Sequence, residues 1–412
     1  MARWNHRYDT DRYNARMSNV FSSKGNLTDL AGYFFSGYGP VSFMVGGGSQ
    51  PERYAPLMPF LREVIGRMPI IVLHGQSRLL EDHICQAWGA LPEEGRPPLW
   101  LTNSERPYFE PFVGMSVGQV ISTVRRIGQT LGYTAQPKLE RVVRAHAEVL
   151  RQLQIPMSLT GLSYLCSFVD MGELHANVME LPCGQDTARR IWADMGADAD
   201  DGQFDLFRTA VQNLEKDASR SGWIADEQIS EYNIITAMQA CAVLSISIDR
   251  YYTEQLLPYL LEELKLASVR PFVLLIDGLQ IRDEAFQEYL CDPNASRICG
   301  YLADNVLELT AGDKEQFLRL ADGVRSFVFF KQGTGKTAAD LSEVFGRFEY
   351  TKVNTTQGTN RGAYEIFARG RHDDVQYSTE NRFRVMPEEL MALGYRQAIV
   401  FDTQTNQIIH FN

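Results

Sequence analysis

The sequence has few of the patterns that mark metal, disulfide or zinc-protease sites. Its six cysteines are widely spaced and include no C-x-x-C pair, and no H-E-x-x-H motif occurs. Neither a zinc ribbon nor a disulfide framework is therefore indicated. Unpaired thiols of this kind are typical of a cytoplasmic protein.

Positive charge is also scarce, because 40 lysines and arginines face 51 aspartates and glutamates, for a net charge of −11. This balance argues against a surface that coats nucleic acid, although it leaves room for a local basic patch. Residues 1–24 lack the pattern of a signal peptide. The uncharged stretch 30–48 holds six glycines and a proline, which argue against a spanning helix. We expect a cytoplasmic protein, peripheral at most to a membrane complex.

Short apolar runs predict an α/β fold with a mostly parallel sheet. The clearest run, Phe272 to Ile276, follows a proline and ends at Asp277 and Gly278. Strands buried on both faces have this composition and are typical of parallel sheets covered by helices. Further strands are expected at 41–45, 69–73, 99–102, 326–330, 397–401 and 407–411, and weaker ones at 297–301, 306–309, 350–356 and 363–367.

Helical periodicity dominates the middle of the chain. Apolar residues recur at 3.6-residue spacing over 117–131, 139–153, 159–169, 186–195, 205–218 and 227–242. We therefore expect an all-helical subdomain at 130–245, inserted between two parts of one α/β domain at 36–129 and 246–412. A polar arm at 1–35 precedes them.

The first candidate site is the turn between the predicted strand 69–73 and a helix at 79–88. This strand-turn-helix context suits a phosphate-binding loop, and the turn consists of Gly75, Gln76, Ser77 and Arg78. A working loop also needs a second glycine, a lysine and a hydroxyl residue. Those positions fall on Leu80, Glu81 and Asp82. Two carboxylates facing a polyanion disfavour ATP and Mg²⁺, and an ordinary turn of a Rossmann-like sheet is the simpler interpretation.

The second candidate is the turn between the predicted strand 326–330 and a helix at 337–345. It contains the Gly-Lys-Thr of a phosphate-binding loop, in a run with Gly333, Gly335, Lys336 and Thr337. The motif's first glycine falls on Phe330, and only about 75 residues follow, too few for a complete NTPase core. An anion could still bind the backbone N–H groups where the helix begins.

Asp277 is the third candidate, because P-loop NTPases use an aspartate at a strand end to position Mg²⁺. The alternative is an acidic N-cap of the next helix, on which Asp283 and Glu284 are expected to lie.

A basic cluster near the C-terminus is the fourth candidate, and it consists of Arg361, Arg369, Arg371, Arg382 and Arg384. These side chains could contact DNA or an acidic partner, whereas a solvated loop is the commoner explanation.

Together, these elements resemble the nucleotide-binding domain of type IV secretion and conjugation coupling proteins, relatives of hexameric DNA-translocating ATPases in the P-loop translocase superfamily. The resemblance extends from the strand and turn at 70–77 through 99–112 and the helical insertion to 272–277. It is most specific at Ser326 to Gly346, similar to the family's strand, glycine turn and helix. Val385 to Phe401 is similar to its terminal Pro-(Asp/Glu)-Glu-Leu helix and Ala-Ile-Val strand. The resemblance implies a RecA-like fold.

The departures from the family pattern concern its catalytic residues. The P-loop Gly-Lys-(Ser/Thr) is replaced by Leu80, Glu81 and Asp82, and the glutamate after the strand aspartate by Gly278. Asp304-Asn305 stands where the family's sensor strand ends in glutamine. We expect this chain to lack the family's membrane-spanning N-terminal helices. Without the lysine and the carboxylate, phosphate neutralisation and positioning of the attacking water are lost.

The sequence therefore predicts a catalytically inactive, coupling-protein-like domain that binds neither ATP nor Mg²⁺. It would serve a secretion, conjugation or mobile-element system by binding other proteins, as a homo- or hetero-oligomer, with the inserted helices recruiting a partner. Arg78 and Glu81 are expected to fill the space above Gly75 and Asp277 by pairing across it. Two alternatives stay open: an NTPase that uses Asp277 and Lys336, and a DNA-binding protein that uses the basic cluster.

Overall fold

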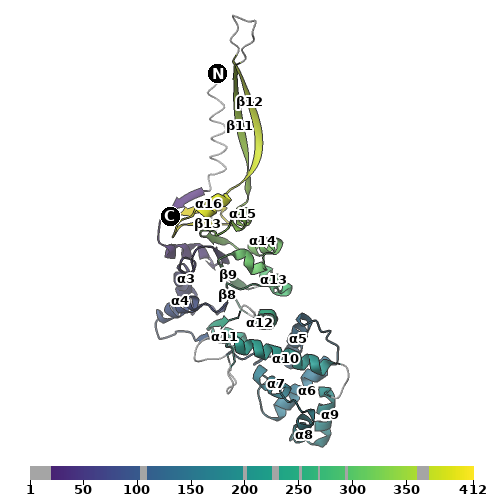
Figure 1. The fold of residues 1–412 in the computed structure, drawn as a ribbon. Helices are drawn as coiled ribbons and strands as arrows, with labels where there is room; N and C mark the ends of the chain where they lie inside the picture. The colour runs from purple at the N-terminus through teal and green to yellow at the C-terminus, as the bar shows by residue number, and fades with distance from the viewer. Residues whose placement is uncertain are drawn as a thin grey trace. The chain divides into compact units, whose positions relative to one another are not determined.

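The structure is a computed structural model that describes residues 20–102, 109–197, 202–224, 232–249, 253–267, 270–292, 296–359 and 371–412. The chain divides into two compact units (Figure 1). The larger is Asn26–Ser326, and the smaller combines Phe327–Asn412 with the segment before residue 26. Residues 1–19 of the predicted arm and the predicted strand 363–367 lie outside the described residues.

The larger unit is built on six parallel strands in the order β4-β9-β8-β5-β7-β6. Their bounds are β4 (Phe43–Gly46), β5 (Ile70–His74), β6 (Leu99–Leu101), β7 (Val243–Ser247), β8 (Phe272–Asp277) and β9 (Arg297–Ala303). β5 and β8 are buried along their whole length, as expected for strands covered on both faces. β7 was not predicted, because serines at 245 and 247 interrupt its apolar run.

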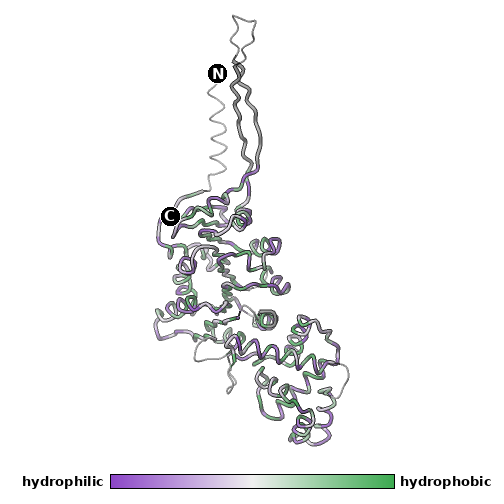
Figure 2. Tube along the Cα trace, viewed as in Figure 1, coloured by the Kyte–Doolittle hydropathy of each residue, from purple (hydrophilic) through white to green (hydrophobic). Residues whose placement is uncertain are grey.

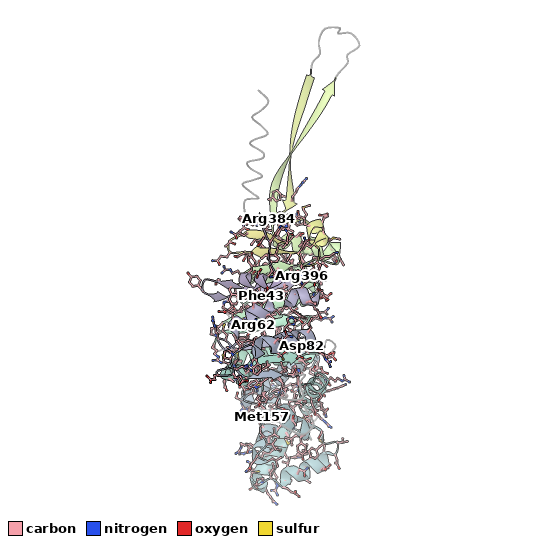
Figure 3. All side chains as sticks on the ribbon, turned by 90° about the vertical axis from the view of Figure 1, so that its left-hand side faces the viewer. Phe43, Arg62, Asp82, Met157, Arg384 and Arg396 are labelled. Atoms are coloured by element: carbon pink, nitrogen blue, oxygen red, sulfur yellow. The ribbon has the colours of Figure 1, made fainter. Side chains whose placement is uncertain are left out.

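The inner strands of this sheet pack tightly around Gly300 on β9. A Cβ atom there would lie 2.5 Å from Leu275 and 2.6 Å from Phe43, so only glycine lets these two side chains meet. Phe43, marked in Figure 3, stacks on Phe34 with ring centroids 3.9 Å apart. Phe60 closes the cluster edge-on, 5.0 Å from Phe43. The centre of the sheet is thus a fixed base for the residues at its carboxyl edge.

Short helices connect these strands. They are η1 (Leu27–Phe34), α2 (Gln50–Tyr54), α3 (Leu57–Val64), α4 (Arg78–Gly89), α12 (Thr253–Ala267), α13 (Glu284–Cys291), η2 (Val306–Thr310) and α14 (Lys314–Asp322), with a small β2 (Phe35–Ser36) and β3 (Gly39–Pro40) hairpin. The predicted strand 306–309 is wrong. It is the 3₁₀ helix η2, because the Asn305 side chain accepts the Leu307 N–H at 3.2 Å and closes a turn there.

Helices follow one another between β6 and β7. They are α5 (Val117–Thr130), α6 (Leu139–Gln152), α7 (Leu159–Cys166), α8 (Met171–Met179), α9 (Gln185–Met195), α10 (Gln203–Arg220) and α11 (Ile234–Ala240). Apolar and polar residues alternate along them, as the green and purple of α5 and α10 show in Figure 2. The sequence missed α8 and placed the start of α11 too early for the described residues. The subdomain bounds 130 and 245 stay a prediction.

The smaller unit contains the strand order β1-β14-β13-β10. β1 (Val20–Ser23) pairs parallel with β14 (Gln407–Phe411), which pairs antiparallel with β13 (Ala398–Asp402). β10 (Ser326–Phe329) leads toward α15 (Gly335–Val344), and α16 (Pro387–Ala392) precedes β13. A two-stranded antiparallel ribbon joins β11 (Arg347–Thr359) to β12 (Arg371–Phe383).

The predicted fold class, an α/β protein with a mostly parallel sheet flanked by helices, is confirmed. Among the described helices, none combines the length and the hydrophobicity that a membrane crossing requires.

Candidate functional site

Four strands of the larger unit end beside one polar hollow of about 280 Å³. Its lining is formed by α2, the helix that follows β4, and by residues at or after the ends of β5, β8 and β9: Gln50, Arg53, Tyr54, Gly75, Gln76, Ser77, Asp277, Gly278, Leu279, Gln280, Ala303, Asp304 and Glu308. Open α/β sheets place their ligands outside the carboxyl ends of the strands. The hollow is therefore the candidate site.

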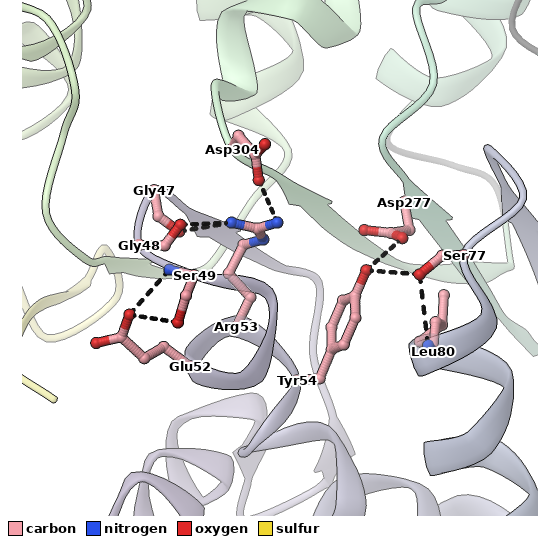
Figure 4. A network of polar contacts seen from close by, with 10 residues as sticks. All are labelled: Gly47, Gly48, Ser49, Glu52, Arg53, Tyr54, Ser77, Leu80, Asp277 and Asp304. Carbon is pink, nitrogen blue, oxygen red and sulfur yellow. Dashed lines mark hydrogen bonds and ion pairs between the residues drawn. The ribbon is translucent and has the colours of Figure 1, made fainter. Parts of the chain in front are cut away.

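The turn after β4 holds a carboxylate of its own. Gly47 and Gly48 have φ of 78° and 62°, a left-handed conformation that favours glycine, and the chain then enters α2 at Ser49. The Glu52 carboxylate accepts the Ser49 N–H at 2.8 Å and the Ser49 hydroxyl at 2.7 Å (Figure 4). An internal anion thus occupies part of a turn where a phosphate-binding loop keeps its donors for the ligand.

Arg53, the next residue, is buried and tied to three groups. Its Nη1 donates to the carbonyls of Gly47 at 3.0 Å and Gly48 at 2.8 Å. Its Nη2 forms an ion pair with Asp304, the first residue after β9 (Figure 4). The guanidinium therefore joins the ends of β4 and β9, and its charge is already paired.

Tyr54 reaches across to β8 and β5. Its hydroxyl donates to Asp277 Oδ2 at 2.7 Å and lies 3.0 Å from Ser77 Oγ (Figure 4). Burial, reinforced by the adjacent Asp277 carboxylate, raises the pKa of Tyr54, so the phenol keeps its proton. Burial also raises the pKa of Asp277, against the lowering influence of the Tyr54 hydrogen bond and the Arg53 charge.

The spacing of these residues matches a phosphate-binding loop in all but residue type. With Gly47 as the first glycine of G-x-x-x-x-G-K-[ST], the second glycine falls on Glu52, the lysine on Arg53 and the hydroxyl residue on Tyr54. These residues were not predicted as a site. The signal was present, because a strand ending at three glycines and a helix soon afterwards can both be read from the sequence.

The predicted turn after β5 contributes to the same hollow. Gly75, Gln76 and Ser77 line it, and Ser77 caps α4 by accepting the Leu80 N–H at 3.4 Å. Gln76 adopts a left-handed φ of 58°.

The expected pairing of Arg78 with Glu81 is wrong. Glu81 is buried and lies 3.2 Å from His74 Nε2, whereas Arg78 is exposed. The His74 ring is fixed by the Ser77 N–H, which donates to Nδ1 at 2.9 Å, so its Nε2 faces Glu81. Asp82 is exposed and lines a separate, open hollow with Gln76, Arg78 and Glu81.

The interpretation of Asp277 as a helix cap is also wrong. Asp283 caps α13 by accepting the Phe286 N–H at 2.7 Å, and Glu284 is the first residue of that helix. Asp277 lies six residues earlier and accepts from Tyr54 instead. It is thus part of the polar network at the sheet edge.

The turn with the Gly-Lys-Thr sequence lies in the smaller unit. The Thr334 hydroxyl caps α15 by accepting the Thr337 N–H at 3.3 Å, and it lies 2.9 Å from the Thr337 hydroxyl. Gly333, Gly335 and Lys336 are exposed, and Phe330 is fully buried. The threonine pair thus already satisfies one of the N–H groups that an anion would need.

The predicted basic cluster is only partly described. Arg361 and Arg369 lie outside the described residues, and of Arg371 only the backbone, at the start of β12, is described. Arg382 pairs with Phe348 in the ribbon register. Arg384 donates to the Asn406 carbonyl at 3.0 Å, and burial lowers the pKa of its guanidinium.

The described residues form neither a metal site nor a hydrolase nucleophile site. Within the described ranges, no three His, Cys, Asp or Glu side chains gather as a metal site would require. A G-x-S-x-G sequence does occur at 114–118, but its Ser116 caps α5 by accepting the Gln119 N–H at 3.4 Å. It follows a turn at 111–114 instead of ending a sheet strand, unlike a hydrolase nucleophile.

Comparisons with known proteins support the fold. No protein-family model matches the chain, and no curated protein matches it by sequence. Among solved structures, the unbound bacterial conjugative coupling protein TrwBΔN70 is similar, with a TM-score of 0.50 and 13% identity over 90% of this chain and 84% of that one. VirB4 of Thermoanaerobacter pseudethanolicus gives a TM-score of 0.46 and 11% identity over 90% and 88%. The likeness to TrwBΔN70 confirms the expected coupling-protein-like, RecA-like fold.

Proposed function

We propose that the chain is a catalytically inactive, coupling-protein-like domain whose nucleotide site is filled by its own side chains. The observation that carries the proposal is the Tyr54 hydroxyl on Asp277, which occupies the strand-end aspartate that would otherwise position Mg²⁺. The turn after β4, and not the turn after β5, is then the degenerate phosphate-binding loop.

Three residues, two after β4 and one after β8, differ from the motif, and each difference removes a role that phosphoryl transfer requires. Arg53 carries a positive charge at the lysine position, but that charge is paired with Asp304. Tyr54 places a bulky phenol where a small hydroxyl would bind Mg²⁺. Gly278 supplies no carboxylate to orient water beside Asp277.

The charges around the hollow also disfavour a nucleotide. A triphosphate would approach Asp277, Asp304 and Glu308 at the lining, with one paired guanidinium to offset them. Like charges at close range destabilise such a complex. ATP and Mg²⁺ are therefore not expected as cofactors.

Calorimetric titration of ATP with and without Mg²⁺, together with an assay of phosphate release, tests this proposal. The wild-type chain should give no Mg²⁺-dependent binding and no turnover. The matched variant Glu52→Gly/Arg53→Lys/Tyr54→Thr restores the loop sequence and should gain measurable ATP affinity. Tight Mg²⁺-dependent binding or steady hydrolysis by the wild type would establish the alternative, an NTPase with a non-standard loop.

A domain without turnover would act by binding other proteins, and we propose a role as a scaffold or recruitment component in a secretion or conjugation system. The coupling-protein-like fold and the exposed apolar side chains Tyr164 and Val169, on or next to α7, support this role. Tyr164→Ser/Val169→Ser should reduce recovery of secretion-system proteins with the full chain, whereas Tyr395→Ser in the smaller unit should not. Equal recovery by both would contradict recruitment by the helices.

DNA binding through the basic cluster remains the other alternative. It predicts an affinity for duplex DNA that falls steeply with salt. No binding at low salt would remove it.

A further inference from the structure

Loop 109–115, in the larger unit, is fastened to several helices at once. The Glu110 N–H donates to the Tyr232 carbonyl at 2.8 Å, and the Leu159 N–H at the start of α7 donates to the Pro111 carbonyl at 2.9 Å. Asn233, the cap of α11, donates from Nδ2 to the Val113 carbonyl at 2.5 Å. The loop is therefore a junction between α7 and α11.

Glu110 fastens the loop to α7 through its side chain. It is 1% exposed. Its carboxylate accepts the Thr160 N–H and the Thr160 hydroxyl, both at 2.9 Å. The titratable groups that face it are Glu215 on α10 and Tyr259 on α12. Neither supplies a positive charge.

Glu263 performs the same task on α12. It is completely buried, and it accepts the Tyr259 hydroxyl at 2.6 Å and the Ile234 N–H, at the start of α11, at 3.1 Å. Tyr259 in turn accepts the Phe112 N–H at 3.4 Å. A chain of hydrogen bonds thus runs from loop 109–115 through Tyr259 to Glu263, and Tyr259 is the titratable group that faces Glu263.

Aromatic side chains on either side of Glu110 in the loop pack against Trp223 and Tyr259. Phe109 meets Trp223 with centroids 4.9 Å apart, and Phe112 meets Tyr259 at 5.5 Å. Among the described residues, no lysine or arginine forms an ion pair with either acid. Burial raises the pKa of Glu110 to about 7 and that of Glu263 to about 8.

We propose that Glu110 and Glu263 form a protonation-controlled latch that holds loop 109–115 to α7, α11 and α12. Protonated, each acid keeps its backbone N–H donor on the carbonyl oxygen and directs its own O–H to the hydroxyl of Thr160 or Tyr259, so the helices stay fastened without a buried charge. Ionised, each leaves a buried charge that pairs with no lysine or arginine of the described residues, and the loop and the starts of α7 and α11 loosen. The latch is independent of any nucleotide and makes the helical segment responsive to pH.

The sign of the effect follows from the direction of the shifts. The acids hold protons in the folded chain at pH values where an unfolded glutamate, with a pKa of about 4.3, has lost its own. The stabilisation is fully present below about pH 4.3, and it is lost progressively as the pH rises to about 8. Above that pH no further loss arises from these groups.

Amide hydrogen exchange on the full chain between pH 5.5 and 9 tests the latch. The amides of Thr160 and Ile234 should exchange faster with rising pH by more than the tenfold per unit of base catalysis. The buried Ile65 amide, which donates to the Leu61 carbonyl at the end of α3, should not. Glu110→Gln/Glu263→Gln should remove the excess acceleration, because the glutamine side chains cannot ionise. An excess that persists in this double variant, or none in the wild type, would overturn the proposal.

A second measurement needs no variant to fold. Infrared titration of the wild-type chain should show a protonated carboxyl band at pH 6.5 that disappears by pH 9. Carboxyl groups that are already fully ionised at pH 6.5 would equally overturn the latch.

Discussion

Two glycine turns of this chain show that a nucleotide site has two separate requirements. The turn must have the right motif residues, and it must lie at the right place in the sheet. The turn after β10 contains the motif's Gly-Lys-Thr, but its Lys336 is exposed and a threonine pair caps the helix. The turn after β4 lacks the motif's second glycine, lysine and small hydroxyl residue. However, β4 pairs with β9, which Asp304 follows, and β9 pairs with β8, which ends at Asp277. A working nucleotide site needs both the motif residues in the turn and acidic residues at the ends of the neighbouring strands.

The difference also determines where stability depends on polar side chains. After β4, Arg53 and Tyr54 are buried and bonded to neighbouring strands. After β10, the lysine contacts solvent. Equivalent substitutions in the two turns should therefore have very different consequences.

The largest difference in stability is expected when one side chain in each turn is truncated to alanine. Tyr54→Ala removes a fully buried ring and should lower the free energy of unfolding by about 3–5 kcal/mol. Lys336→Ala removes an exposed side chain and should leave the urea midpoint unchanged. Equal midpoint shifts would mean that the two turns do not differ as described.

The sequence predicted the strands around the site better than the side chains that fill it. Strands β5 and β8 were placed correctly because fully buried strands are continuous apolar runs, and the acidic end of β8 followed directly. The sheet order could not be read from the sequence, since pairing of β4 with β9 joins segments more than 250 residues apart. Without that order, the turn after β5 looked like the better strand-turn-helix.

The side chains that fill the site were unpredictable for a related reason. A tyrosine one turn into a helix has no sequence feature that distinguishes a core residue from one that contacts Asp277. Glu81 was expected to pair with Arg78, but a strand residue, His74, lies closer to it. Such pairings depend on tertiary geometry, which local spacing does not encode.

A smaller effect is expected for the buried guanidinium. Arg53→Ala removes two hydrogen bonds to carbonyls and one ion pair, and should cost about 2 kcal/mol, since the remaining Asp304 is exposed to water. Arg53→Lys keeps the charge but cannot reproduce the fork of donors, so it should recover only part of the loss. Urea unfolding measures both variants. Full recovery by lysine would indicate that charge alone holds the turn.

The loss of the Tyr54 hydroxyl should be smaller again. Tyr54→Phe keeps the ring and leaves Asp277 without one donor, which should cost about 1–2 kcal/mol. Thr334→Ala, the matched cap in the turn after β10, should cost about 1 kcal/mol through its helix. Thermal unfolding compares the two. A gain in stability of Tyr54→Phe would show that Asp277 is not bonded to the phenol.

The smallest expected effect is a change in the pH dependence of stability in the same Tyr54→Phe variant. Burial raises the pKa of Asp277 in the folded chain, so its contribution to stability is present below the unfolded pKa and is lost as the pH rises through the folded pKa. The Tyr54 hydrogen bond lowers that pKa. Without the hydroxyl, the pKa of Asp277 should rise further, and the loss should continue to higher pH. Urea midpoints taken from pH 4 to 8 should therefore fall over a wider range in Tyr54→Phe than in the wild type, while Thr334→Ala should run parallel to the wild type. If the curves of urea midpoint against pH for Tyr54→Phe and the wild type were parallel, Asp277 would not be bonded to the Tyr54 hydroxyl. Its carboxylate would then be available to a ligand.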